Sequence, residues 1–505
     1  MKIKRILSAL LSVLLLLGTT TACAGPTEDP SAGTSAPATQ STETEAETLV
    51  TDSLPDDLNF NDTEITFISR YFDGWTSGEI AVEELISEAV NDAIYERNEA
   101  VEERLHVTIV SIEDNTTDPY PVVTKVENSV KAGTNEYDVL AAACYVALPS
   151  TLKGNYVNLR GKDTEYLDLN QPYWSQGLNE VVEYGGAQFA MTGEALITLY
   201  RMAFVTCFNQ ALFDKVGQPY LYEYVDNGTW TLDQQISLVP LFHQDNGNGL
   251  QDDQGDIYGF ASGTVASIDP YWSSCMVDII RKNADGIYEL VLDNDRIHGV
   301  TEKVLNLFHN TNGASRIFAT HGYGGEHDDI RDLFSDGYCA MATLHIMKLE
   351  STPLRNMKDT YGIVPMPKYD EAQSGYRTLL HDQFTVFCVP TTVQGDDLSM
   401  VCATLEAMAS ASYHIVKPAY YETTLRTKIA QDPKSSEMMD LIIDNVYIDA
   451  GIIYTNSLPG FQGQLRDLVN SKTNNAVSRF TALAKQTKGQ LRSILKKLDE
   501  LAARG

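Results

Sequence analysis

Three short apolar runs late in the chain constrain its fold more than any other feature. They lie at 339–341, 361–364 and 384–389, and polar residues, glycine or proline separate them. Their length and their β-branched and aromatic residues are typical of strands buried on both faces of a sheet. A comparable run occurs much earlier, at 65–68. The sequence therefore predicts a lobe assembled from distant parts of the chain, with 384–390 and 65–68 in one sheet.

The early part of the chain alternates strand and helix patterns. Strand-like runs at 65–68, 107–112 and 137–140 are separated by amphipathic helical patterns at 91–105 and 122–130. Such alternation predicts a parallel sheet covered by helices. Ligands in open α/β sheets bind beyond the carboxyl ends of the strands, so the loops that follow these strands are candidate binding loops.

Several local motifs resemble one known family. They read NDAIYERN at 91–98, FSDGYCAM at 334–341, YGIVPMPKYDE at 361–371 and AYYE at 419–422. The chain resembles the extracellular solute-binding proteins of ABC transporters, the family that includes maltose-type sugar binders. The resemblance implies an α/β fold of the periplasmic-binding-protein type II class, in which two lobes are joined by discontinuous chain crossings and a hinge.

The same resemblance implies a division of the chain between the lobes. Lobe one is expected to contain 54–195 and 343–392, so that the run at 361–364 completes its sheet. Lobe two is expected to contain 196–342 and 393–505, with the C-terminal helices packed on it.

The N-terminal residues follow the order of a secretory leader. Three basic residues precede an apolar run at 6–17 that is too short for a membrane span, and Thr-Thr-Ala-Cys follows at 20–23. We expect residues 1–22 to be a lipoprotein signal peptide and Cys23 to be lipidated; an ordinary cleaved signal peptide is the alternative. Residues 23–53, rich in Thr, Ser, Pro, Ala and Glu, are expected to form a disordered tether.

Charge and cysteine spacing exclude several classes of function. The formal net charge is −32, which argues against nucleic acid and against attraction to anionic membranes. None of the seven cysteines forms a CxxC pair, so a zinc or redox centre is not expected. The cysteines within apolar runs are interpreted as buried hydrophobic residues, and their pairing as disulfides stays open.

The polar loop at 244–256 is similar to a calcium-binding loop. Calcium requires several oxygen ligands that converge in a tight turn. The weak candidate ligands are Asn246, Asn248, Asp252 and Asp256. Because neutral side chains occupy positions that are often acidic, a plain Asn-Gly turn is the preferred interpretation. No other cofactor is expected.

No catalytic motif is recognisable: GxSxG, the P-loop, the dinucleotide fingerprint and the zincin spacing are all missing from the sequence. The chain has 26 tyrosines and four tryptophans, and aromatic rings stack on the CH-rich faces of sugars. We therefore expect no catalytic residues. The predicted ligand-binding residues are Tyr71, Trp75, Tyr145, Arg201, Trp272, His345 and Gln383.

The expected function is the capture of a small solute, a mono- or oligosaccharide, and its delivery to an ABC transporter permease. The protein is expected to be a monomer, extracellular and attached to the bacterial membrane only through its lipid anchor. An extracellular carbohydrate-active hydrolase and a ligand-sensing lipoprotein are the alternatives. Turnover of sugar would distinguish the hydrolase from a binding protein.

Overall fold

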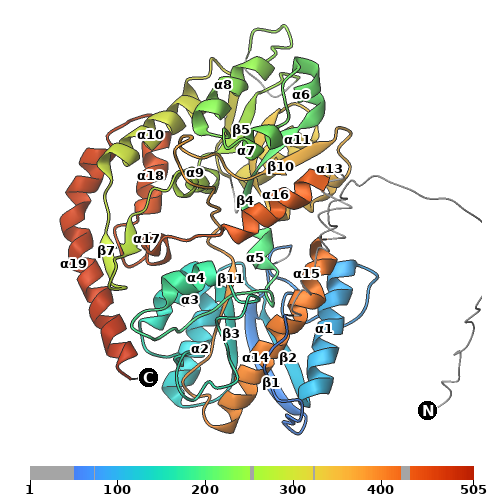
Figure 1. Cartoon of the computed structure of the whole chain (residues 1–505), viewed down its shortest axis with the longest axis vertical. Coiled ribbons are helices and arrows are strands. Elements are labelled where there is room, and N and C mark those ends of the chain that lie inside the picture. Colours follow the sequence, from blue (N-terminus) through green and yellow to red (C-terminus); the bar gives the residue numbers. More distant parts are fainter. Residues whose placement is uncertain (1–49, 73, 251–254, 322–324, 422–432, 505) are drawn as a thin grey trace, which may run out of the picture. The chain divides into compact units, whose positions relative to one another are not determined.

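The first sheet contains three parallel strands and one antiparallel strand, in the order β11-β3-β1-β2 (Figure 1). In this computed structural model, residues 50–505 are described except 73, 251–254, 322–324, 422–432 and 505. The strands are β1 Thr63–Arg70, β2 Val107–Asp114, β3 Val139–Ala143 and β11 Thr385–Cys388. The predicted pairing of the late run with the first strands is confirmed, because β11 is antiparallel to β3, which is parallel to β1.

Helices cover both faces of this sheet and complete lobe one. They are α1 Ala89–Leu105, α2 Tyr120–Ala132, α3 Cys144–Thr151, α4 Gln176–Val182, α14 Asp396–His414 and α15 Val416–Ala419. Ile65 and Phe67 of β1 lie in one apolar core with residues of α1 and α14, whereas Ile68 lies in the other core with residues of α2 and α3. Because side chains alternate between the two faces of a strand, β1 contributes side chains to the apolar cores on both sides of the sheet.

The second sheet has five strands in the order β10-β4-β9-β5-β8 and forms the centre of lobe two (Figure 1). Its strands are β4 Phe204–Asn209, β5 Phe260–Gly263, β8 Ser315–Phe318, β9 Met341–His345 and β10 Tyr361–Val364. Strands β5, β8 and β9 are parallel, and β4 is antiparallel to β9.

Lobe two is completed by helices and a two-stranded hairpin. The helices before the hairpin are α6 Gln210–Val216, α7 Leu221–Asp226, α8 Leu232–Phe242, the 3₁₀ turn η1 Ala266–Ile268 and α9 Asp269–Ser274. The hairpin consists of β6 Ile280–Lys282 and β7 Tyr288–Leu290. The later helices are α10 Asn294–His309, α11 Gly325–Ser335, α12 Ile346–Leu349, α13 Thr352–Arg355, α16 Pro433–Asp444, α17 Ala450–Ile453, α18 Phe461–Asn470 and α19 Ala476–Ala502.

Two segments belong to different lobes from those expected. Strand β10 pairs antiparallel with β4, so the run at 361–364 completes lobe two and not lobe one. The chain returns to lobe one only near His381, whose backbone N–H donates to the carbonyl of Met202 at 2.7 Å. The expected boundary at 343 is therefore too early, because α12 and α13 turn the chain back to the edge of the second sheet.

The second correction concerns the segment after 393, which was expected in lobe two. Helix α14 packs on α1, and its residues Val401, Leu405 and Met408 share an apolar core with Val101 of α1. The apolar face of this helix is therefore buried in lobe one. The chain then continues to α16, which packs on β10.

Short local elements connect the two lobes at the first crossing. Helix α5, Thr198–Arg201, lies between the two sheets in Figure 1 and leads directly into β4. Ala203 forms an isolated bridge with Leu380 of the return crossing. Residues 50–505 together form one compact unit. Among the described residues, no helix combines the length and the apolar character needed to cross a membrane.

The six cysteines in the described part of the chain are all buried and free. This confirms their interpretation as small hydrophobic residues. Cys23 and the leader and tether residues up to 49 lie outside the described residues, so lipidation stays a prediction.

Candidate functional site between the lobes

The carboxyl ends of parallel strands in both sheets lead to residues that meet between the lobes. Strand β1 ends at Arg70 and is followed by a loop that carries Trp75, whereas β9 ends at His345. The Trp75 and His345 rings lie 5.4 Å apart between centroids, and the Lys348 ammonium lies 5.9 Å from the Trp75 ring. Trp75 belongs to lobe one and its two neighbours belong to lobe two, so this tryptophan marks a direct contact between the lobes.

Three histidines surround the lobe-two side of this contact. The His345 ring lies 4.8 Å from that of His327 and 5.7 Å from that of His381, which belongs to the return crossing. Burial holds the pKa of both His327 and His345 well below the usual range, and nearby positive groups act in the same direction. These two imidazoles are therefore neutral at pH 7, and a neutral imidazole can both donate and accept hydrogen bonds.

Charged side chains form the polar part of the same region. Arg70 donates to the Gln383 side chain at 2.6 Å and to the Thr117 carbonyl at 3.0 Å. Burial alone would raise the pKa of Asp382, but a hydrogen bond with His381 and the charges of Arg466 and Arg70 outweigh it and hold the pKa below its usual value. Asp382 is thus an ionised acceptor held near groups from both lobes.

Arg466 and Asp269 contribute an ion pair from lobe two. Arg466 Nε donates to Asp269 Oδ1 at 2.8 Å, and its terminal nitrogen pairs with Oδ2. Asp269 also accepts a hydrogen bond from Gln462. We call Arg70, Trp75, His327, His345, His381, Asp382, Gln383, Asp269 and Arg466 the inter-lobe cluster.

The loop that carries Trp75 is fixed to both crossings by Glu79. Its carboxylate accepts hydrogen bonds from the Thr198 hydroxyl at 2.6 Å, the Thr198 N–H at 2.8 Å and the Thr385 hydroxyl at 2.6 Å. Thr198 opens α5 and Thr385 opens β11. The position of Trp75 is therefore coupled to the segments about which the lobes would move.

The seven predicted ligand-binding residues separate into two groups. Trp75, His345 and Gln383 lie in the inter-lobe cluster. Tyr145 lies beside Tyr120, and the Tyr145 carbonyl accepts a hydrogen bond from Asn456 of lobe two at 3.3 Å. This second contact between lobes places Tyr145 next to the same interface, and the partly exposed Tyr71 directly follows β1.

Arg201 and Trp272 have other surroundings. Arg201 forms a two-pronged ion pair with Glu350 at 3.0–3.1 Å, and Glu350 also accepts from the Tyr420 hydroxyl. Trp272 is buried in lobe two and lines a small internal cavity with Asp269 and Gln462. The ion pair with Glu350 accounts for the position of Arg201, and the ligand-binding role of both residues stays a prediction.

The candidate calcium loop uses several of its oxygens for its own backbone. Asp256 is buried and accepts from the N–H of Asn246 at 2.9 Å, and Asn246 accepts from the N–H of Asn248 at 2.9 Å. Asp252 lies outside the described residues. Within the described ranges, no group of three or more His, Cys, Asp or Glu side chains is placed to hold a metal ion. The preference for a plain Asn-Gly turn over a calcium site stays a prediction.

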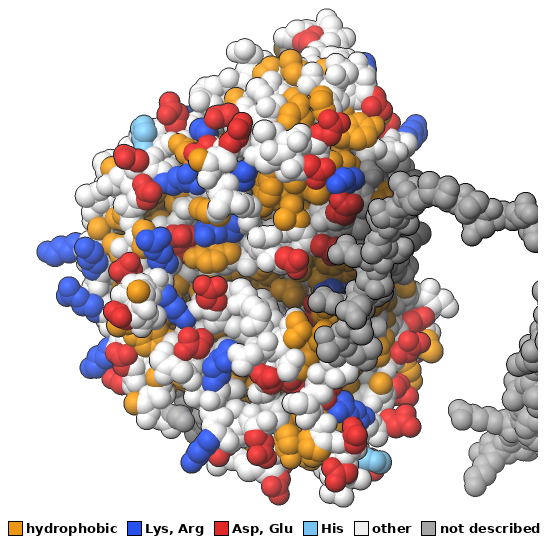
Figure 2. Space-filling model, in the orientation of Figure 1, with side chains coloured by type: hydrophobic (Ala, Val, Ile, Leu, Met, Phe, Trp, Pro, Cys, Tyr) orange, Lys and Arg blue, Asp and Glu red, His pale blue; other side chains and the backbone are white. Residues whose placement is uncertain are grey.

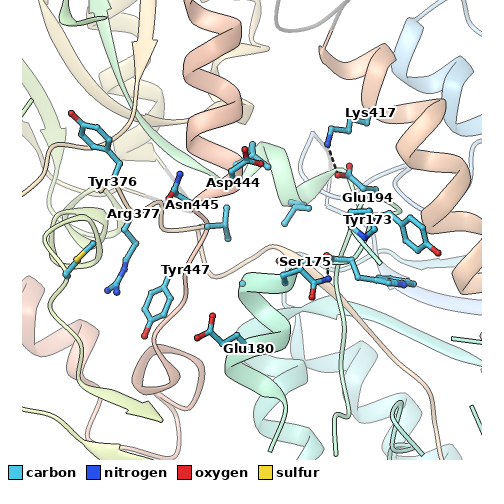
Figure 3. A pocket seen from close by; sticks show the side chains of 18 residues that line it. Tyr173, Ser175, Glu180, Glu194, Tyr376, Arg377, Lys417, Asp444, Asn445 and Tyr447 are labelled. Atoms are coloured by element: carbon cyan, nitrogen blue, oxygen red, sulfur yellow. Dashed lines mark hydrogen bonds and ion pairs between the residues drawn. The ribbon is translucent and has the colours of Figure 1, made fainter. Parts of the chain in front are cut away.

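A separate cavity of about 550 Å³ opens beside the crossings (Figure 3). Its lining includes Glu194, Arg377, Lys417 and Tyr447, but none of the seven predicted ligand-binding residues. Its two cations are already paired, Lys417 with Glu194 at 3.1 Å and Arg377 with Asp278 at 2.6 Å. Because the walls come from both lobes, the shape of this cavity depends on the angle between them.

Glu406, at the centre of lobe one, gives a testable pH dependence. Burial raises its pKa to about 7, although it accepts hydrogen bonds from Tyr173 and Trp174. A glutamate in an unfolded chain titrates near 4.3, so between about pH 4.3 and 7 the folded state binds the extra proton. Glu406 therefore reduces the unfolding free energy as the pH rises through this window, by about 1–3 kcal/mol.

We expect Glu406→Gln to remove this contribution. Between pH 4.5 and 7.5, the unfolding free energy of the variant should rise by about 1–3 kcal/mol relative to that of the wild type. Urea unfolding at each pH measures this difference. The exposed Glu64→Gln serves as the matched control and should run parallel to the wild type. Parallel curves for Glu406→Gln would contradict the assignment.

Comparisons with known proteins identify the fold. No family model and no curated protein matches the sequence. Among solved structures, the chain is similar to an ABC substrate-binding protein of Listeria monocytogenes in complex with cycloalternan, with 14% identity, a TM-score of 0.51, and coverage of 87% of this chain and 99% of the other.

Two further structures agree. A sugar transporter protein of Rhizobium etli in an open conformation has 15% identity, a TM-score of 0.54, and coverage of 87% and 99%. UgpB of Mycobacterium tuberculosis in complex with glycerophosphocholine has 15% identity, a TM-score of 0.53, and coverage of 87% and 98%. The chain therefore has the two-lobed α/β fold of ABC-transporter substrate-binding proteins.

Proposed function

We propose that the protein binds a small solute, a mono- or oligosaccharide, between its two lobes. The observation that carries this proposal is the inter-lobe cluster, where side chains from both lobes and from the return crossing meet at the carboxyl ends of strands. Closure of two lobes around a hinge traps a ligand at such a place. The fold neighbours include a protein in complex with cycloalternan, which supports a carbohydrate ligand.

The balance of charge in the cluster favours an uncharged polar ligand. Arg466 is paired with Asp269, and Arg70 and Arg466 both act on the ionised Asp382. A charged solute would have to disrupt this balance, whereas hydroxyl groups can exchange hydrogen bonds with carboxylates, guanidinium groups and neutral imidazoles. Trp75, which stacks on Phe72 with 4.9 Å between ring centroids, is an aromatic member of the cluster, and aromatic rings can stack on the CH-rich faces of sugars.

The cluster does not favour the hydrolase alternative. Glycosidases require one protonated and one ionised carboxyl group on either side of the scissile bond. Burial raises the pKa of Asp269, but both of its oxygens are engaged by Arg466 and so are not offered to a glycosidic oxygen, and Asp382 is held ionised by a lowered pKa. We therefore propose binding without turnover, followed by delivery of the solute to an ABC permease by a monomer anchored to the cell surface through Cys23.

A thermal-shift screen of residues 50–505 tests this function. The panel contains maltose, cycloalternan, glycerophosphocholine and a tripeptide, and each mixture is then analysed for sugar hydrolysis. A saturating sugar should stabilise the protein by about 2.7 kcal/mol at a hundredfold excess over Kd, with the sugar recovered intact. Stabilisation by the tripeptide alone, or release of smaller sugars, would contradict the proposal.

A further inference from the structure

Helix α19 carries an exposed line of basic residues on a strongly acidic chain. Lys485, Lys488, Arg492 and Lys496 are all exposed, at spacings of three, four and four residues. Residues three or four apart lie on the same side of a helix. We call these four residues the basic stripe. The whole chain has 69 acidic and 37 basic residues, so the stripe is a local reversal of the overall charge.

The side of α19 opposite the basic stripe packs against the protein, so the stripe faces solvent. Leu491, Ile494, Leu498 and Leu501 are buried, and the helix packs on α10 and β7 of lobe two. Near its end, Asp499 accepts a hydrogen bond from Tyr184 of lobe one at 3.2 Å. Figure 1 shows α19 along one edge of this unit, and Figure 2 shows basic side chains gathered on that edge.

The charges of the stripe are largely uncompensated. Among the described residues, no ion pair involves Lys485, Lys488 or Arg492, and Lys496 lies 3.8 Å from Glu500. The first acidic residue of α19 is Asp499, near its C-terminal end. Clustered charges of one sign create a local potential that attracts ligands of the opposite sign.

The surface beside the stripe is polar and shallow. Beside Lys485 lies a hollow of about 540 Å³. It is lined by small and amide-bearing residues, which are Ala482, Gln486, Gly489, Gln490 and Ser493. No large hydrophobic residue of α19 is exposed within its described length. The face therefore offers ammonium, amide and hydroxyl groups, which suit phosphate oxygens, and it lacks the apolar side chains with which helices insert into a bilayer.

We propose that the basic stripe docks a linear polyanion that carries phosphate groups. The width of the stripe favours a thread-like partner over a membrane plane. The four cations form a single row along one helix, and no large hydrophobic side chain among the described residues of α19 is exposed for insertion into a bilayer. A linear polymer can contact such a row along its length. This inference concerns a different face from the inter-lobe cluster and goes beyond solute binding.

The proposal is tested by fluorescence anisotropy, which measures the binding of fluorescently labelled inorganic polyphosphate to residues 50–505. These residues form one compact unit with their own cores. The triple variant Lys485→Gln, Lys488→Gln, Arg492→Gln is compared with the control Lys131→Gln, Lys215→Gln, Lys358→Gln, which removes the same charge from exposed sites elsewhere. We expect the stripe variant to bind at least about tenfold more weakly and the control within about twofold of the wild type. Both variants should keep the wild-type Tm.

Salt dependence gives a second readout. Each phosphate neutralised on a single strand contributes about −0.7 to the slope of log K against log salt, so the stripe variant should lose about 2 from the slope. Three results would overturn the proposal: an equal loss of affinity in both triple variants, no binding of polyphosphate, or binding to phosphatidylglycerol vesicles in place of polyphosphate.

Discussion

Arg97→Ala is expected to lower the unfolding free energy by about 3–5 kcal/mol, because it leaves several buried acceptors unpaired. Arg97 lies on α1 and is fully buried. Its guanidinium donates to the carbonyls of Ile80 and Ala195 at 2.5 and 3.1 Å and to the Asn98 side chain at 2.8 Å. The substitution leaves buried carbonyls without a partner and opens a cavity, and both effects destabilise the fold.

The measurement is urea unfolding at pH 7, with Lys497→Ala as the control. Lys497 forms an exposed pair with Glu500 on α19, and such pairs contribute little to stability. Because the Ile80 carbonyl lies at the end of the loop that carries Trp75, Arg97→Ala should also weaken sugar binding in protein that remains folded. A loss of less than about 1 kcal/mol in unfolding free energy would show that the hydrogen bonds of Arg97 do not hold these segments together.

Trp75→Ala is expected to have the largest effect on ligand affinity. The side chain is only 7% exposed and joins a lobe-one loop to His345 and Lys348 of lobe two. Its removal takes away aromatic surface for a sugar and a contact that holds the lobes together. Aromatic anchors of this kind contribute about 2–4 kcal/mol, so Kd should rise about 30- to 1,000-fold.

Calorimetry with the sugar selected by thermal shift measures this effect. Circular dichroism should show that Trp75→Ala remains folded at the temperature of the titration. The control is Tyr338→Ala, an exposed aromatic residue of lobe two, whose affinity should equal that of the wild type. An unchanged Kd for Trp75→Ala would remove this tryptophan from the site.

Local patterns allowed the strands and helices to be predicted, but not all of their partners. The runs at 65–68 and 361–364 are both strands in the structure. The assignment of the second run to lobe one was wrong. Helices α12 and α13 turn the chain back to the edge of the second sheet, so the run pairs with β4 of lobe two. Likewise, the segment that contains α14 was expected in lobe two, yet α14 packs on α1 of lobe one, which lies about three hundred positions earlier in the sequence.

The polar part of the cluster shows the same limit. Gln383 was predicted from its place next to a strand, and the structure adds Arg70 as its partner. Asp269 and Arg466 are separated by 197 positions and have no local motif that links them. A pair of this kind becomes recognisable only when the fold brings α9 and α18 together. His327 and Asp382 were not among the predicted ligand-binding residues.

A crystal structure of residues 50–505 with the sugar that the thermal-shift screen selects shows directly whether the ligand lies between the lobes. We expect sugar density there, in contact with Trp75 and with polar groups of the inter-lobe cluster such as Asp382 and Gln383. Sugar density in the cavity lined by Glu194 and Tyr447, or on the outer surface of either lobe, would contradict this expectation.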